Sequence, residues 1–281
     1  MSLQEQCLLV TLEIGLPPLT RKALRASEDA EAKYKTAKRQ VGVKKNLFAR
    51  RDIKPIQSAA SAARVLFNEL SLPYDHNRRI ITTESYFSFV EKMAGASAIF
   101  DSLRHKFLNE YHITLMRSEM ELGTLWRGDD YPSVDSLKER MYFSIESTVL
   151  PSVTGFDNLV GLDEEELEKI KREAVKGQRA KVQEALVSLV DRLKTSLNKA
   201  AIRLADTDTY FKDTIISNIT AALEAVETLN ITNDQKIIDL AKDVRETMEG
   251  VTPKDLRKDE KLREETAEDA QKLVDKMSDF F

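Results

Sequence analysis

The chain has 281 residues, 42% of them hydrophobic and 32% charged, which excludes a disordered protein and indicates a globular one. The formal net charge of −4 requires no cationic partner, and the single cysteine, Cys7, excludes an internal disulfide or multi-cysteine zinc site. Because no segment approaches the ~18 consecutive apolar residues of a membrane span and the start lacks a signal peptide's basic region, we expect a cytoplasmic protein without a membrane partner.

The scarcity of turn-forming residues predicts long helices. The chain contains nine glycines, about half the usual frequency of ~7%. The predicted fold class is mainly α: an elongated helical bundle or coiled-coil-like body with a small N-terminal β element. We expect a helical core with a two-stranded β element in residues 1–160, and a long-helix bundle or arm in 161–281.

Residues 7–16 form a short apolar run that Pro17 and Pro18 end. Its length and β-branched content favour a strand, which needs a partner for its backbone groups. Residues 79–82 and residues 152–160 are the alternatives, and the apolar positions of 152–160 favour that segment. Cys7 has no neighbouring base in this run, so a buried structural thiol is favoured over a nucleophile.

A basic tract follows. Residues 21–54 contain twelve Lys or Arg against four Asp or Glu, a formal charge of +8. One interpretation is a phosphate-binding surface for nucleic acid or nucleotide, and the other is a solvated helix over 20–40 that pairs with acidic helices. No zinc-finger, P-loop or RNP signature accompanies the tract. The candidate surface residues are Lys38, Arg39, Lys44, Lys45, Arg50 and Arg51.

Two helices are predicted next, over residues 53–70 and 84–126. In the second, apolar residues from Phe100 to Trp126 recur at helical spacing, with Thr83 as a plausible N-cap and Gly128 as the closing residue. Without a break, this helix would be roughly 65 Å long. It carries the only tryptophan of the chain, and we interpret it as the core.

No constellation in this stretch predicts catalysis. His105 and His112, with Asp101 one turn before them, could suggest a metal site, but the histidines would be ~10 Å apart along the helix. The pair Asp129 and Asp130 fits turn and cap residues better than acid–base catalysis. We predict no catalytic, cofactor-binding or metal-binding residues, and a protein that is not an enzyme.

The second half of the chain is predicted to form further helices. Ser133 can cap a helix to about residue 148, and Asp163 can open a very long helix whose glutamates suit its positive N-terminus. A helix from residue 207 or 208, a shorter one ending at Gly250, and a last one opened by Thr252 and Pro253 follow.

The last helix is charged almost all round. Residues 254–276 carry few large apolar side chains, which is typical of a projecting helix or one docked on another subunit. An apolar end follows, which we interpret as an assembly tip that docks on another protomer: Leu273, Met277, Phe280 and Phe281.

Two groups of residues carry a resemblance. The first is Leu72-Pro73-Tyr74-Asp75 with Arg78-Arg79-Ile80-Ile81, and the second is residues 107–111 with the turn 122–133. Their order, over roughly residues 5–160, resembles a family of uncharacterised phage and bacterial proteins often encoded near MoxR-like AAA ATPases and von Willebrand A-domain proteins. The resemblance implies a phage origin and work beside a ring ATPase, and it supplies no catalytic residues.

The leading hypothesis is a non-enzymatic helical assembly or adaptor protein, a homo-oligomer that works with a MoxR-like AAA ATPase and an A-domain partner. The alternative is a nucleic-acid-binding protein that uses the 21–54 tract. A helical pore-forming protein is a further, less favoured alternative, because no hydrophobic hairpin is present. No cofactor is expected.

Overall fold

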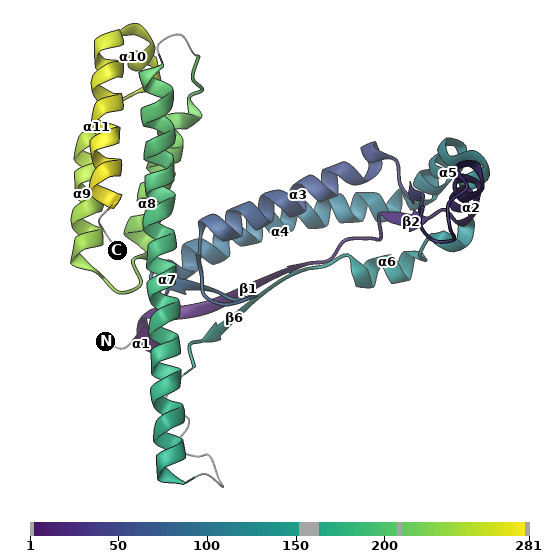
Figure 1. The fold of residues 1–281 in the computed structure, drawn as a ribbon, viewed down its shortest axis with the longest axis horizontal. Helices are drawn as coiled ribbons and strands as arrows, with labels where there is room; N and C mark the ends of the chain where they lie inside the picture. The colour runs from purple at the N-terminus through teal and green to yellow at the C-terminus, as the bar shows by residue number, and fades with distance from the viewer. Residues whose placement is uncertain (1–2, 152–162, 207–209, 279–281) are drawn as a thin grey trace. The chain divides into compact units, whose positions relative to one another are not determined.

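The computed structural model describes residues 3–151, 163–206 and 210–278. Most of these residues are helical, and a four-stranded sheet of order β4-β5-β1-β6 accompanies the helices (Figure 1). This confirms the predicted mainly helical fold with a minor β element.

The elements of the first part of the chain alternate between helices and short strands. They are α1 (Leu3–Gln6), β1 (Cys7–Ile14), β2 (Thr20–Lys22), α2 (Leu24–Tyr34), β3 (Lys44–Asn46), α3 (Arg50–Glu69), β4 (Leu72–Pro73), β5 (Arg79–Thr82) and α4 (Tyr86–Asn109). The later elements are α5 (Tyr111–Leu122), η1 (Gly123–Leu125), η2 (Gly128–Asp130), α6 (Val134–Arg140), β6 (Phe143–Val149), α7 (Glu164–Ala205), α8 (Thr214–Leu229), α9 (Gln235–Met248), α10 (Pro253–Lys258) and α11 (Glu260–Ser278).

The chain divides into two compact units. Unit 1 comprises residues 1–11, 68–89 and 146–281, and unit 2 comprises residues 12–67 and 90–145. The predicted boundary between residues 160 and 161 lies outside the described residues, and the first predicted domain contributes residues to both units.

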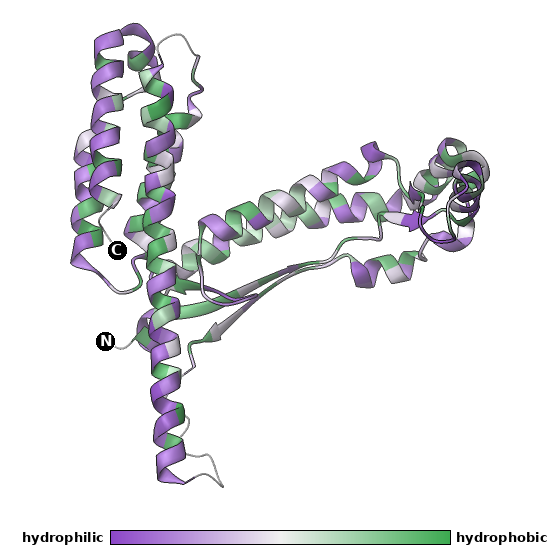
Figure 2. Cartoon of the chain, viewed as in Figure 1, coloured by the Kyte–Doolittle hydropathy of each residue, from purple (hydrophilic) through white to green (hydrophobic). Residues whose placement is uncertain are grey.

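In unit 1, α8 and α11 pack on α7, and α9 packs on α8 and α11. Asp163 caps α7 as predicted, because its carboxylate accepts a hydrogen bond from the Glu166 backbone N–H at 2.8 Å. One row of α7 is buried in this bundle: Val182, Ala185, Leu186, Leu189, Val190, Leu193, Leu197, Ala200, Ala201 and Leu204. This spacing gives α7 one apolar stripe, and Figure 2 shows hydrophilic residues over much of the rest of its surface.

The charged last helix is docked rather than projecting, so that expectation is wrong. Ala267, Ala270, Leu273, Val274 and Met277 of α11 are buried, and α11 packs along α7. The sequence does not reveal this buried stripe, because alanines, which leave little apolar signal in a charged sequence, supply part of it. Leu273 and Met277 therefore belong to the core of unit 1, while Phe280 and Phe281 of the predicted assembly tip lie outside the described residues.

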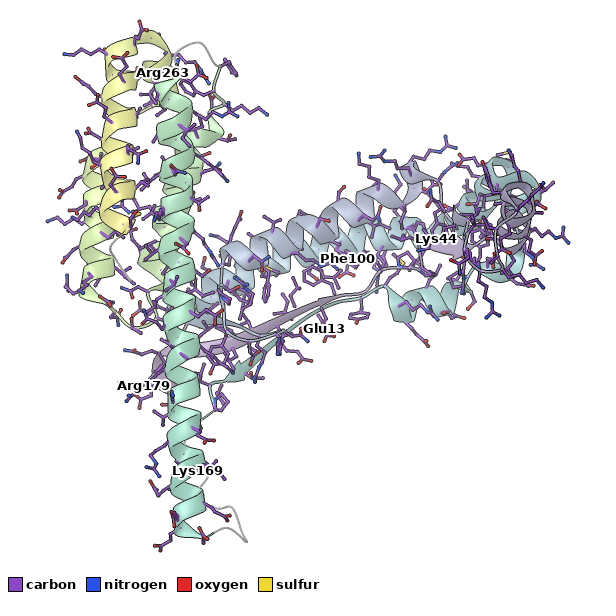
Figure 3. All side chains as sticks on the ribbon, viewed as in Figure 1. Glu13, Lys44, Phe100, Lys169, Arg179 and Arg263 are labelled. Carbon is purple, nitrogen blue, oxygen red and sulfur yellow. The ribbon has the colours of Figure 1, made fainter. Side chains whose placement is uncertain are left out.

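Guanidinium groups close two helix ends in unit 1. Arg263, only 9% exposed, donates to the Leu204 carbonyl at 2.9 Å, beside the end of α7 (Figure 3). Arg192 of α7 and Arg79 of β5 both donate to the Ser71 carbonyl just after α3, at 2.7 and 2.8 Å. Burial, with the nearby Arg192 charge, lowers the pKa of Arg79 to about 10. These cations satisfy carbonyls at the negative ends of helices.

The strand pairing corrects a prediction. In unit 1, β1 pairs antiparallel with β5, with Cys7 opposite Thr82 and Val10 opposite Arg79. The less favoured alternative, residues 79–82, is therefore one partner of β1, and β6 is the other, so the sheet has four strands instead of the predicted two. The favoured segment 152–160 lies outside the described residues. Ile80 and Ile81 are fully buried, so this short strand, despite its flanking charges, contributes to the core. Cys7 is buried as expected, and burial raises the pKa of its thiol to about 12.

Unit 2 has a core of its own. Leu47, Phe48, Ile53, Ile56 and Ala60 meet side chains of α4, α5, α6 and the residue that follows α6: Phe100, Phe107, Tyr111, Leu137 and Met141. Phe100 of α4, labelled in Figure 3, contacts Phe143 with ring centroids 5.8 Å apart. Gly15 is required where the chain passes α6, because a Cβ atom there would lie 2.1 Å from the Arg140 carbonyl oxygen.

Three predicted helices of unit 2 are wrong in their bounds. The predicted helix over 84–126 begins at Tyr86, breaks between α4 and α5 at Glu110, and ends at Gly123, whose φ of +50° requires glycine, instead of at Gly128. No proline or glycine lies at the break. There Tyr111 turns into the core, and its hydroxyl donates to the Pro132 carbonyl at 2.8 Å.

The other two corrections concern segments that form strands. The predicted helix over 20–40 is strand β2 followed by the shorter α2. Ser133 caps α6 as predicted, but this helix ends at Arg140, and the β-branched run after it forms β6 instead of continuing the helix to residue 148. None of the described helices is both long and apolar enough to cross a membrane.

Candidate nucleic-acid interface

The basic tract of unit 2 is built on a two-stranded antiparallel ribbon. β2 pairs with β3 so that Thr20 lies opposite Asn46, Arg21 opposite Lys45, and Lys22 opposite Lys44. Side chains alternate between the two faces of a strand, so Lys22 and Lys44 share one face. Both are exposed. Like charges directly opposite each other destabilise a strand pair, so folding alone does not favour this arrangement.

The loop between α2 and β3 holds further cations in a fixed conformation. Lys35 ends α2 with φ +52°, and Arg39 has φ +67°. The Arg39 backbone N–H donates to the Glu31 carboxylate at 2.6 Å, and the Val43 N–H donates to the Ser27 hydroxyl at 3.0 Å. Residues other than glycine rarely adopt positive φ. Lys35 does so as the left-handed residue that ends α2, and Arg39 does so where its backbone N–H is held by Glu31.

Lys45 does not belong to the exposed phosphate surface that the sequence predicts. It is only 5% exposed. Its ammonium group donates to the Leu125 carbonyl at 2.5 Å and lies 2.5 Å from the Asp130 carboxylate. This lysine therefore serves the fold, and only a contact 80 residues away along the chain reveals that role.

The other five predicted residues are exposed, and Lys22 joins them. Of these, Arg51 pairs with Glu121 at 3.0 Å. Within the described parts of the chain, the other side chains form no ion pair, so the interpretation of an internally paired tract applies only to Lys45 and Arg51. We call the exposed set the basic surface: Lys22, Lys38, Arg39, Lys44, Arg50 and Arg51. Figure 3 shows Lys44 at the end of unit 2 that holds β2 and α2.

The two units carry formal charges of opposite sign, which the net charge of the whole chain does not reveal. Unit 2 contains 20 Lys and Arg against 14 Asp and Glu, a formal charge of +6. Unit 1 contains 23 Lys and Arg against 33 Asp and Glu, a formal charge of −10. The basic surface thus belongs to a unit that is positive as a whole, a property that the overall value of −4 obscures.

Beside the basic ribbon lies an aromatic cluster centred on Phe48. Its ring meets Phe107 at 5.5 Å, Tyr131 at 5.8 Å and Tyr111 at 6.2 Å between centroids. Phe48 follows β3 by two residues, so the strand that carries Lys44 leads directly into the cluster. Edge-to-face contacts of this kind fix the rings in place.

Next to this cluster is an open groove of about 570 Å³, which we call the Trp126 groove. Trp126 and Tyr131 stack with centroids 6.0 Å apart and an interplanar angle of 28°. A Cβ atom added at Gly128 would lie 3.4 Å from the nearest atom of the Trp126 indole, at ordinary contact distance. The groove is lined by Leu108, Tyr111, His112, Leu115, Trp126, Gly128, Tyr131, Pro132, Ser133 and Val134.

The two tyrosines stay neutral over the physiological range. Burial, with the nearby Tyr131, raises the pKa of Tyr111 to about 12, and burial also raises the pKa of Tyr131. Their hydroxyls therefore remain hydrogen-bond donors, and the groove gains no charge from them.

The residues considered for metal or acid–base chemistry are not brought together. Asp101 pairs with Arg104 at 3.5 Å, and His105 and His112 are both exposed. Within residues 3–151, 163–206 and 210–278, no group of three His, Cys, Asp or Glu side chains could hold a metal ion. Asp130 pairs with Lys45.

The chain matches no protein-family model, no curated protein and no solved structure. The resemblance to the phage and bacterial family therefore stays a prediction. The structure nevertheless places the residues that carry it. Asp75 and Arg78 form a bidentate ion pair, Lys181 of α7 lies 4.9 Å over the Tyr74 ring, and the turn 122–133 builds one wall of the Trp126 groove.

Proposed function

We propose that this protein is a non-catalytic nucleic-acid-binding protein whose unit 2 contacts the phosphate backbone. The observation that carries the proposal is the exposed pair Lys22 and Lys44, directly opposite each other on the β2–β3 ribbon. Among the described residues, no carboxylate pairs with either. Phosphates would remove the repulsion between these lysines, and release of counterions from the nucleic acid would favour binding.

The test is the salt dependence of binding, measured by fluorescence anisotropy of a labelled single-stranded oligonucleotide. For the parent protein, the logarithm of affinity should fall linearly with the logarithm of salt concentration. Combined Lys22→Glu and Lys44→Glu should weaken binding by at least about tenfold at low salt and reduce the slope by about 1.4, because each lost phosphate contact removes about 0.7.

Unit 1 offers a matched control. Lys176 and Lys199 of α7 are exposed and form no ion pair with another described residue. Their combined change to Glu alters the net charge by the same amount and should leave affinity and slope unchanged. No binding by the parent at low salt, or equal losses in both double variants, would contradict the proposal.

A second proposal, an adaptor that binds a protein partner, is supported by α5. Ile113, Met116 and Met120 are 44%, 64% and 77% exposed, and their spacing of three and four residues places them on one face. Exposed methionines suit adaptable protein contacts. The partner that the family resemblance implies is a MoxR-like AAA ATPase with an A-domain protein, and a second copy of this chain is the other partner that we propose.

This adaptor role is tested by mass measurement of the purified protein alone and with a candidate ATPase. Met116→Glu with Met120→Glu should reduce any complex, whereas Val65→Glu, at an exposed position of α3 (56%), should not. If the parent stays monomeric and binds no ATPase, the adaptor proposal fails.

A further inference from the structure

We infer that the Trp126 groove receives one unpaired nucleobase, so that unit 2 recognises single-stranded rather than duplex nucleic acid. This inference rests on the proposed function, because it needs the strand that the basic surface binds. It adds the class of nucleic acid and the site at which a base is held.

The groove has the size and the walls for a base. Its volume of about 570 Å³ lies within the range of small-ligand sites. Trp126, Tyr131 and Tyr111 line it with aromatic rings, and His112 is exposed at its margin. Aromatic side chains are the usual stacking platforms for unpaired bases, and every base has a π face that such rings accept.

The basic surface and the groove are fastened to each other within unit 2. Lys45 binds the Leu125 carbonyl and the Asp130 carboxylate, residues that immediately precede Trp126 and Tyr131. Its neighbours Lys44 and Asn46 are exposed. The ribbon that would contact phosphates is therefore fixed to the turn that forms the groove. A strand could then place its phosphates on the ribbon and one of its bases in the groove at the same time.

Charge favours a base over an apolar peptide as the occupant of the groove. Unit 2 carries a formal charge of +6, and its basic surface would hold the phosphates of the strand whose base enters the groove. The indole Nε1–H of Trp126 is buried, so a base would be held by stacking on the aromatic rings rather than by this donor.

Trp126 is the only tryptophan of the chain, so its fluorescence reports base stacking in the groove. The experiment titrates the full-length protein with a short oligothymidylate, with the matching duplex and with inorganic polyphosphate, which has no bases. Binding is followed by calorimetry and base stacking by Trp126 fluorescence. We expect all three ligands to bind the basic surface, and only the oligothymidylate to quench the fluorescence.

The outcomes separate this inference from the proposed function. If all three ligands bind but the oligothymidylate does not quench, or the duplex quenches equally, the inference is overturned and phosphate binding stands. If none binds, both are overturned, and the groove is left to an apolar side chain of a protein partner.

A substitution gives a second measurement. Trp126→Leu should lower oligothymidylate affinity by on the order of tenfold, and Trp126→Phe, which keeps an aromatic ring, should restore most of it. Polyphosphate affinity should be the same in both variants, which shows that the basic surface is still folded. An equal loss for both ligands would instead assign Trp126 a purely structural role.

Discussion

Unit 1 and unit 2 use their charged side chains differently. In unit 1, with a formal charge of −10, Arg79, Arg192 and Arg263 are turned inward to bind carbonyls at helix ends. In unit 2, with a formal charge of +6, Lys22 and Lys44 are directed outward from a ribbon, and no described carboxylate pairs with them. Cations that satisfy internal carbonyls stabilise a fold, whereas clustered cations without internal partners favour an external polyanion.

The largest expected effect concerns the core that supports the ribbon of unit 2. Phe100 is fully buried, so Phe100→Ala should lower the free energy of unfolding by about 3–5 kcal/mol. The neighbouring Ile99 is 61% exposed, and Ile99→Ala should change it by no more than about 0.5 kcal/mol. Denaturant unfolding measures both. Equal effects would show that α4 does not face the core as described.

The next effect separates the structural lysine of unit 2 from its exposed neighbour. Lys45→Met should cost about 3 kcal/mol, the lower end for a broken buried pair, because the Asp130 side chain is 25% exposed. Lys44→Met should change stability by less than about 0.5 kcal/mol but weaken oligonucleotide binding. Unfolding and anisotropy measurements on the same pair test this. If Lys44→Met were the destabilising change, the division of roles would be reversed.

In unit 1, the corrected position of α11 gives a somewhat smaller effect. Leu273 is 8% exposed, so Leu273→Ala should cost about 2–3 kcal/mol, in the lower part of the range for buried leucines. Light scattering should show an unchanged assembly state. A lower assembly state with unchanged stability would restore the exposed assembly tip that the sequence predicts.

The smallest effect is a difference in alkaline stability. An acid whose pKa is raised by folding stabilises the fold fully below its unfolded pKa and loses that contribution as pH rises through its folded pKa. For Tyr111 in unit 2 this window runs from pH 10 to about 12, and for Cys7 in unit 1 it runs from pH 9 to about 12. Within its window, each group should lower the free energy of unfolding by up to about 1.4 kcal/mol for every pH unit.

Unfolding free energies measured from pH 8 upward test this window. Tyr111→Phe should remove the part of the decline that begins near pH 10, and Cys7→Ala the part that begins near pH 9. A profile that is the same for parent and variants would show that neither group is as buried as described.

Local signals in the sequence predict several elements of the fold. Asp163 before α7, Ser133 before α6, and Thr252 with Pro253 at α10 all cap helices as expected, because capping depends on a few adjacent residues. The break at Glu110 and the buried face of α11 depend on packing against distant segments, which periodicity does not report.

The candidate site is likewise predictable from local signals and not where it depends on distant contacts. Five of the six basic residues predicted for the surface are exposed. Sequence can predict this because a dense run of charged residues is a local signal that favours exposure to solvent. Lys45 was included wrongly, and Lys22 was missed. Lys45 is buried because its ammonium group contacts Asp130 and Leu125. Lys22 lies opposite Lys44 because of the register between β2 and β3. The groove was missed because its walls come from two segments, one with Leu108 and Tyr111 and the other with Trp126 and Tyr131, which only the fold brings together. Trp126 and its turn could still be recognised as a distinctive segment.

The most direct test of the difference between the units is photochemical cross-linking. Oligothymidylate bound to the full-length protein is irradiated, and the cross-linked peptides are identified by mass spectrometry. We expect cross-links within unit 2, in the peptides that contain Trp126 and Lys44. Cross-links confined to unit 1, or a parent protein that binds no oligothymidylate at low salt, would contradict it.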